Sequence, residues 1–391
     1  MNTATVEDKV LKFTKKFAKY SGIWPDQNKL VKYILWTMTY IIIVPSLVVQ
    51  VARVVHFFNI TVITEQLGTA SAMILVIVKQ GNYIVNATKY KALLTGIYKD
   101  WAVQRSKEEV AILSTYAARG SFLTSFYLVN AFTCSFLFIT VPWTARLLYT
   151  FSPQNASLPM LNVIPGYYFV EDDHKYYYYI QLQMSIAVIT VIIVFIGCDT
   201  SYAVIVQHAC GLLSVAGHRF KHAINDLSSN RSISEESIKK AYQRVRFSIQ
   251  GHERAITYLK EIESAHIIYL FICMGLVTVC FGITLLKVVT MEYSMDFLKY
   301  GSFLIVQLMH LFYLMVQGQF VINASDEVYD TIYEASWYNS NSRTQALYIL
   351  ALRRSLSLPR LTAGRVIELN MQTFSEVVKL SISYYTVLKS T

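Results

Sequence analysis

Charged residues are scarce in this sequence. Asp, Glu, Lys and Arg together make up 15% of its 391 residues, whereas about 25% is usual in globular chains. Hydrophobic residues reach 54%. A soluble domain of this size would carry more charge on its surface, so the composition favours a protein that lies in a membrane.

Cysteine pairs and catalytic motifs are also missing. The five cysteines include no CxxC pair, which argues against a zinc site. Their odd number, and their absence from the loops expected outside the cell, argue against a disulfide framework. No GxSxG, HExxH or Walker pattern occurs. We therefore expect no catalytic residue, no metal and no cofactor, and His310 is interpreted as a packed or pocket residue.

The pattern of residues 1–32 is not the one expected of a secretory signal peptide. Residues 1–32 carry seven lysines and no apolar stretch that leads to a small-residue cleavage site. The first apolar segment is therefore expected to stay in the protein as a membrane anchor.

The sequence does contain seven long apolar segments. A helix needs roughly 20 apolar residues to cross a bilayer, and long unbroken runs favour helices over barrel strands. The predicted fold class is all-α, with seven transmembrane helices. The segments are residues 33–56, 62–84, 122–149, 176–210, 264–289, 300–325 and 368–388.

Charged residues inside two of these segments need a separate explanation. Glu65 and Lys79 lie near the ends of the second segment, where we expect their side chains to reach the membrane surface. Glu376 and Lys379 make the last segment the most polar. A helix of that kind is better suited to contact protein or line a water-filled path than to face lipid.

The distribution of basic residues predicts the orientation. The N-terminal tail and the loops at 85–119, 211–261 and 326–365 hold 7, 6, 9 and 5 Lys and Arg residues, or 27 of the chain's 35. Basic loops stay in the cytosol. We therefore expect a cytosolic N-terminus and an extracellular C-terminus, which is the opposite of a G-protein-coupled receptor. Asn155, in an Asn-X-Ser sequon of an outer loop, is a predicted glycosylation site.

The cytosolic loops themselves are predicted to be helical. Residues 235–263 form an amphipathic pattern that continues into the fifth segment, and 326–337 and 343–355 have apolar residues at helical spacing. Their apolar faces pack either on their own chain or between subunits. The expected organisation is 1–325 for the tail, six membrane helices and a pocket, 326–367 for a cytosolic anchor, and 368–391 for the last helix.

Several short motifs resemble those of a known family. The sequence SISYYTVL at 381–388 ends the last helix, LTAG at 361–364 precedes it, and CDT at 198–200 and HACG at 208–211 lie in the fourth segment. Together they resemble the insect odorant receptors, over most of the chain. The resemblance implies a ligand-gated, non-selective cation channel that is opened by a small volatile apolar molecule.

The resemblance also implies partners and a location. Odour-tuning subunits of this family combine with a shared co-receptor in a tetramer, in the plasma membrane of olfactory dendrites, and the length of this chain fits a tuning subunit. Expected partners are the odorant, co-receptor subunits and lipid, with no nucleic acid. A gustatory-type receptor of the same superfamily is the nearest alternative. A transporter fits less well because no internal repeat is visible.

The last helix has a stripe of residues that share one face. Leu380, Ser383, Val387 and Thr391 recur at steps of three and four. The resemblance implies that this stripe lines the pore. It places Val387 at a hydrophobic gate, which closes by excluding water, and Thr391 at the outer constriction. The alternative is that Val387 is ordinary packing.

The resemblance further implies an odorant pocket in the outer half of the bundle, between the second, third, fourth and sixth segments. Such a site should be mostly apolar and aromatic. For any single residue, lipid contact or core packing is the alternative. The candidates are Met73, Ile139, Trp143, Tyr179, Gln183, Ile186 and Phe303. Asp199, an acid within the fourth segment, is interpreted as structural, bonded to Thr200 or to neighbouring helices.

Overall fold

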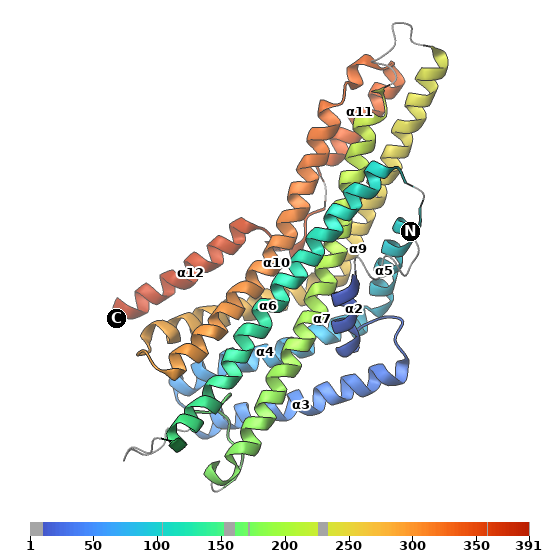
Figure 1. Ribbon diagram of the computed structural model, residues 1–391. Coiled ribbons are helices and arrows are strands. Elements are labelled where there is room, and N and C mark those ends of the chain that lie inside the picture. The colour runs from blue at the N-terminus through green and yellow to red at the C-terminus, as the bar shows by residue number, and fades with distance from the viewer. Residues whose placement is uncertain are drawn as a thin grey trace.

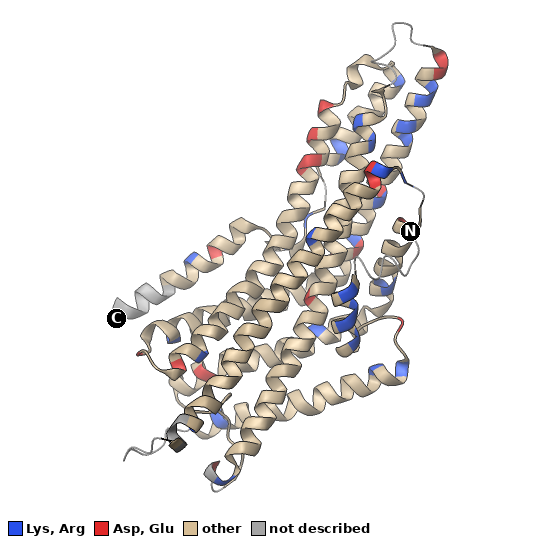
Figure 2. Cartoon of the chain, viewed as in Figure 1, with Lys and Arg blue, Asp and Glu red and all other residues tan. Residues whose placement is uncertain are grey.

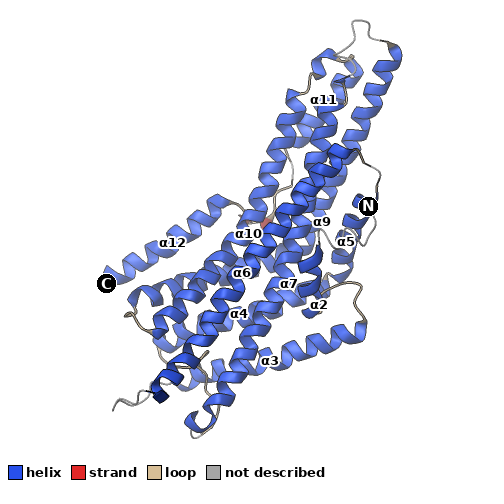
Figure 3. Cartoon of the chain, viewed as in Figure 1, coloured by secondary structure: helices blue, strands red, loops and turns tan. Residues whose placement is uncertain are grey.

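The chain folds into a bundle of long helices. The computed structural model describes residues 11–103, 105–151, 161–170, 173–225, 234–357 and 359–390 (Figures 1 and 3). Its elements are α2 (Lys12–Tyr20), α3 (Lys29–His56), α4 (Ile60–Val85), α5 (Ala87–Ala102), α6 (Lys107–Phe151), α7 (Asp173–His222), α9 (Glu235–Thr290), α10 (Met295–Glu334), η2 (Trp337–Asn339), α11 (Ser342–Ser355), β1 (Thr362–Ala363), β2 (Ile367–Glu368) and α12 (Met371–Ser390). The all-α prediction is confirmed.

Six of these helices are long and apolar enough to cross a membrane: α3, α4, α6, α7, α9 and α10. They correspond to the first six predicted segments. The seventh segment is α12, which has 20 residues. On α3, apolar side chains such as Ile41 and Val48 are more than half exposed. Such an exposed apolar face is costly in water and suits contact with lipid.

Several helices extend well beyond a bilayer. Helix α9 has 56 residues, which at 1.5 Å per residue is about 84 Å, whereas the bilayer core is about 30 Å thick. The extensions of α6, α7, α9 and α10 meet α5 and α11 at one end of the molecule, here called the basic end. Lys and Arg gather there (Figure 2). The predicted helices within 235–263, 326–337 and 343–355 are present in these elements.

Short polar side chains mark where the helices begin. Asn28 accepts a hydrogen bond from the backbone N of Leu30 at 2.9 Å, and Ser234 accepts one from Ser237 at 3.1 Å. Asn341 does the same for α11. A capping oxygen satisfies one of the backbone N–H groups that a helix leaves without a partner in its first turn.

The start of α12 is held tightly against α9 and α10. The β1–β2 hairpin turns at Gly364, whose φ of +65° favours glycine, and the amide of Gly364 donates to Ile267 of α9 at 3.1 Å. A Cβ added to Gly318 of α10 would lie 1.9 Å from the carbonyl oxygen of Leu369, so only glycine allows this approach. Beyond this anchor α12 diverges from the bundle (Figure 1).

Candidate functional site

A cavity of about 110 Å³ lies inside the bundle. Side chains from α4, α6, α7, α9 and α10 line it, together with Ile164 from the segment 161–170. The lining is mainly aliphatic and aromatic, for example Leu75, Phe138, Val191, Phe195 and Phe303. A site of this size and character suits a small, mostly apolar molecule.

Two of the seven pocket candidates, Met73 and Phe303, line this cavity. Ile139 and Trp143 instead pack at the edge of the surrounding core. The Trp143 indole N–H donates to the Ser185 hydroxyl at 3.4 Å.

Three other candidates, Tyr179, Gln183 and Ile186, line a separate shallow groove beside Ile41 and Ile42 of α3. The structure therefore places two of the seven candidates in the cavity and three in a separate groove. Whether the remaining five contact a ligand stays a prediction.

Sequence reasoning missed several polar residues of the cavity. Gln307 lies on the same face of α10 as Phe303, Val306 and His310, at helical steps of three and four. That spacing was visible in the sequence. Val277 and Cys280 of α9 also line the cavity. No sequence pattern predicts this, because the position of α9 beside the cavity depends on how the helices pack.

A buried charged cluster adjoins the cavity. Asp199 of α7 forms an ion pair with Lys79 of α4, and neither side chain is exposed. The Tyr127 hydroxyl donates to Asp199 Oδ2 at 2.8 Å, and His310 Nε2 lies 3.3 Å from the same oxygen and 3.0 Å from Lys79 Nζ. Tyr127 and His310 also line the cavity. We call these four residues the buried cluster.

The buried cluster corrects one prediction and refines another. Lys79 does not reach the membrane surface, because its side chain is fully buried against Asp199 and the Phe195 ring. Asp199 bonds to neighbouring helices, whereas the Thr200 hydroxyl donates to the Ile196 carbonyl at 2.7 Å. An unpaired charge at this depth would be costly, so each charge requires the other.

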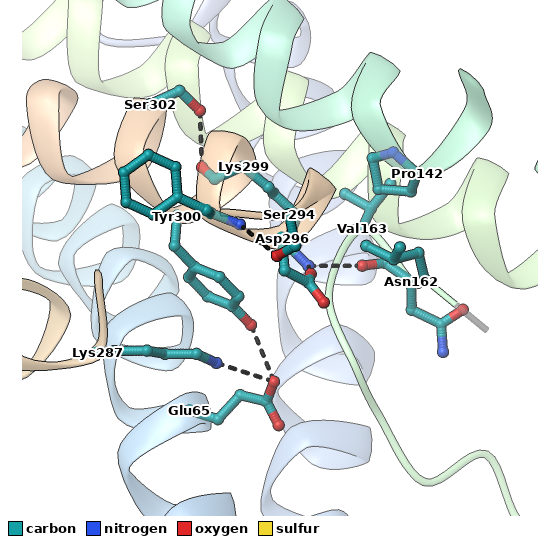
Figure 4. Close-up of polar contacts among 12 residues, drawn as sticks. Glu65, Pro142, Asn162, Val163, Lys287, Ser294, Asp296, Lys299, Tyr300 and Ser302 are labelled. Atoms are coloured by element: carbon teal, nitrogen blue, oxygen red, sulfur yellow. Dashed lines mark hydrogen bonds and ion pairs between the residues drawn. The ribbon is translucent and has the colours of Figure 1, made fainter. Parts of the chain in front are cut away.

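The segment 161–170 is tied across one end of the cavity. Gln66 donates to the Pro165 carbonyl at 2.9 Å, and the Val163 amide donates to Gln181 at 2.9 Å. Lys299 of α10, 2% exposed, donates to the Asn162 carbonyl at 2.8 Å (Figure 4). These bonds hold Ile164 in the lining.

A second polar group braces the same end. Glu65 accepts hydrogen bonds from Lys287 at 3.0 Å and from the Tyr300 hydroxyl at 2.9 Å (Figure 4). Arg53 lies 3.0 Å from its other oxygen. Glu65 thus joins α3, α4, α9 and α10, and its carboxylate is paired rather than extended into water.

The basic end has an ionic network of its own, formed by Asp100, Arg105, Glu109, His208, Arg219 and Arg254. Arg254 and His208 lie 2.8 Å and 3.1 Å from Asp100. Burial alone would raise the pKa of Asp100, but hydrogen bonds from His208 and Arg254 outweigh it, so this pKa is below its ordinary value. Arg219 contacts both oxygens of Glu109, at 2.6 Å and 2.9 Å.

The predicted pore stripe is partly described. Leu380 is 50% exposed and Ser383 is exposed, on a face of α12 that no other part of the described chain covers. Ser381, on another face, is buried. The Val387 side chain, Thr391 and the sequon residue Asn155 lie outside what the structure describes.

Comparisons with known proteins converge on one family. The model of the 7tm odorant receptor family matches residues 59–382. Odorant receptor 13a of Drosophila melanogaster is 22% identical, in a match that covers 94% of this chain and 90% of odorant receptor 13a. Odorant receptor Or1 of Anopheles gambiae is 21% identical, in a match that covers 95% of this chain and 93% of Or1.

The fold has a counterpart among solved structures. The olfactory receptor OR5 of Machilis hrabei, solved in complex with eugenol, superposes with a TM-score of 0.83 over 100% of both chains. A second structure of OR5 superposes on this chain with a TM-score of 0.81. At 12% sequence identity, this likeness establishes a shared fold.

Proposed function

This chain belongs to the 7tm odorant receptor family, and from that membership we propose that it is the odour-tuning subunit of a ligand-gated, non-selective cation channel. The observation that carries the proposal is the mainly apolar cavity among α4, α6, α7, α9 and α10. A small volatile molecule binds there, enclosed by helices that lead toward α12.

The orientation follows from the charge distribution. The side with the N-terminal tail and the loops at 85–119, 211–261 and 326–365, which includes the basic end, is cytosolic, because these segments hold 27 of the chain's 35 Lys and Arg residues. The N-terminus is then cytosolic and the C-terminus extracellular, in a multi-pass protein of the plasma membrane, in the dendrite of an olfactory neuron. Antibody against an epitope on residue 1 should bind only permeabilised cells, and staining of intact cells would reverse this orientation.

The pore is shared among subunits. Leu380 and Ser383 are exposed in the single chain, which supports an interface or a water-filled path that only neighbouring subunits complete. In a tetramer with the co-receptor, the stripe that continues through Val387 and Thr391 surrounds the ion path, and Val387 forms its hydrophobic gate.

Helix α10 provides a physical link between cavity and pore. Its face from Phe303 to His310 lines the cavity, and Gly318 on the same helix touches Leu369, just before α12. His310 and Gly318 are eight residues apart, or about 12 Å along a helix. A small displacement of α10 on ligand binding therefore moves the anchor of α12, since a packed helix shifts as a rigid unit.

A matched pair of substitutions on α7 tests the cavity. Val191→Phe fills it, whereas Ile189→Phe adds the same ring at a surface position. We expect the first to raise the half-maximal odorant concentration by about ten-fold or more and the second to leave it unchanged. The readout is current in cells that also express the co-receptor, at equal surface levels. Equal responses of the two variants would place the ligand elsewhere.

A further inference from the structure

One residue of the cavity lining, Gln307, has a buried side-chain oxygen without a hydrogen-bond partner in the described part of the chain. The residue is 8% exposed, and the oxygen is Oε1. A buried amide oxygen without a partner costs free energy that a bound ligand can recover by donating a hydrogen bond to it.

Three hydroxyl groups of the lining have already given their hydrogens to the protein. The Tyr127 hydroxyl donates to Asp199, the Thr69 hydroxyl donates to Gln50 Oε1 at 2.7 Å, and the Ser71 hydroxyl donates to the Leu67 carbonyl. These three residues therefore offer a ligand lone pairs rather than hydrogens. A ligand hydroxyl can donate to Gln307 Oε1 or to one of these lone pairs, and can accept a hydrogen bond from the Ser135 hydroxyl, which also lines the cavity.

We propose that the preferred ligand of this receptor is a small volatile alcohol or phenol, and that Gln307 selects it by accepting a hydrogen bond from its hydroxyl. The assignment rests on the proposed function, because it names the ligand class of the same cavity. The aliphatic and aromatic walls hold the hydrocarbon part, and the volume of about 110 Å³ limits its size. Hydrocarbons lack the donor, and ethers, ketones and esters bring only acceptors.

The test uses matched volatiles in which only the functional group differs. Each set contains an alcohol, the hydrocarbon with CH₃ in place of OH, and an ether of the same number of heavy atoms, for example 1-hexanol, heptane and methyl pentyl ether. In the aromatic set of phenol, toluene and fluorobenzene, a fluoride takes the place of the ether as the compound without a donor. In the native receptor we expect the hydroxyl compound of the best set to be about ten-fold or more as potent as its two analogues.

Gln307→Met keeps nearly the same length but removes the acceptor. It should abolish the advantage of the alcohol and leave the hydrocarbon response within about two-fold, since apolar contacts are retained. Val306→Ala, a change in a neighbouring lining residue, should shift all members of a set by a similar factor. Gln307→Leu replaces the Met variant if the latter is absent from the cell surface.

The outcomes separate two failures. An alcohol advantage that persists in Gln307→Met, or a native receptor that responds equally to alcohol, ether and hydrocarbon, overturns the hydroxyl assignment and leaves the odorant-gated channel intact. If no volatile of any class opens a channel although both subunits are at the surface, the proposed function and the hydroxyl assignment fail together.

Discussion

Two of the ionic networks in the described part of this molecule, the buried cluster and the network of the basic end, differ in their surroundings. The buried cluster has one acid and one lysine, both with fully buried side chains, at the side of the cavity. The network of the basic end has two acids, three arginines and a histidine, and the Arg254 side chain is 50% exposed. Both networks link several helices, so the number of helices that they link does not explain how they differ.

The difference lies in what replaces a lost partner. At the basic end a second basic residue is available, because Glu109 contacts Arg105 as well as Arg219. In the buried cluster, loss of one charge leaves the other in a medium with little solvation. Thus similar ion pairs are expendable at one site and indispensable at the other, and four substitutions test this contrast.

The largest effect is expected from Asp199→Asn. It leaves Lys79 charged and buried without its counter-ion, at a cost of about 3–5 kcal/mol. We expect a sharp loss of surface protein and a lower melting temperature in detergent. Asp330→Asn, at an exposed site, is the matched control. Similar melting of the two variants would contradict the contrast.

Removal of both charges should do less harm than removal of one. In Lys79→Met/Asp199→Asn no unpaired charge remains, so we expect recovery of more than half the stability lost in Asp199→Asn. Melting of the two single variants and the double variant completes a double-mutant cycle. Additive losses would mean that the two residues stabilise the fold independently.

A smaller effect is expected at the basic end. Arg219→Met leaves Glu109, whose side chain is 11% exposed, with Arg105 as a remaining partner, and should cost about 1–3 kcal/mol. The loss should shrink at high salt because ions screen such pairs. Arg246→Met, on the exposed surface of α9, is the control. A loss as large as that of Asp199→Asn would remove the distinction between the networks.

The smallest effect is a pH dependence at Asp100. Its pKa is lowered in the folded protein, so its ion pairs stabilise the fold above the unfolded value of about 3.9 and this contribution is lost as pH falls through the folded pKa. The difference in melting temperature between native protein and Asp100→Asn should therefore be constant from pH 8 to 6 and shrink below about pH 4. A difference in melting temperature that grows on acidification would mean that folding raises the pKa of Asp100 rather than lowering it.

Part of the site could be predicted from the sequence. Met73 and Phe303 were predicted to line a pocket, and helical spacing from Phe303 leads to Gln307 and His310. The remaining candidates lay on the right helices, but a rotation of a fraction of a turn moves a side chain from the cavity to the lipid face. Hydropathy does not resolve that rotation when a helix is apolar on most of its faces.

The sequence by itself determined the elements and their setting. Long apolar runs require helices in lipid because backbone groups must be satisfied within each segment, and the basic loops bias the orientation. Only the tertiary structure decided which side chains meet. Lys79 and Asp199 are 120 residues apart, and their pairing, like the enclosure of Gln307, depends on how helices pack, which is a property of shape rather than of local composition.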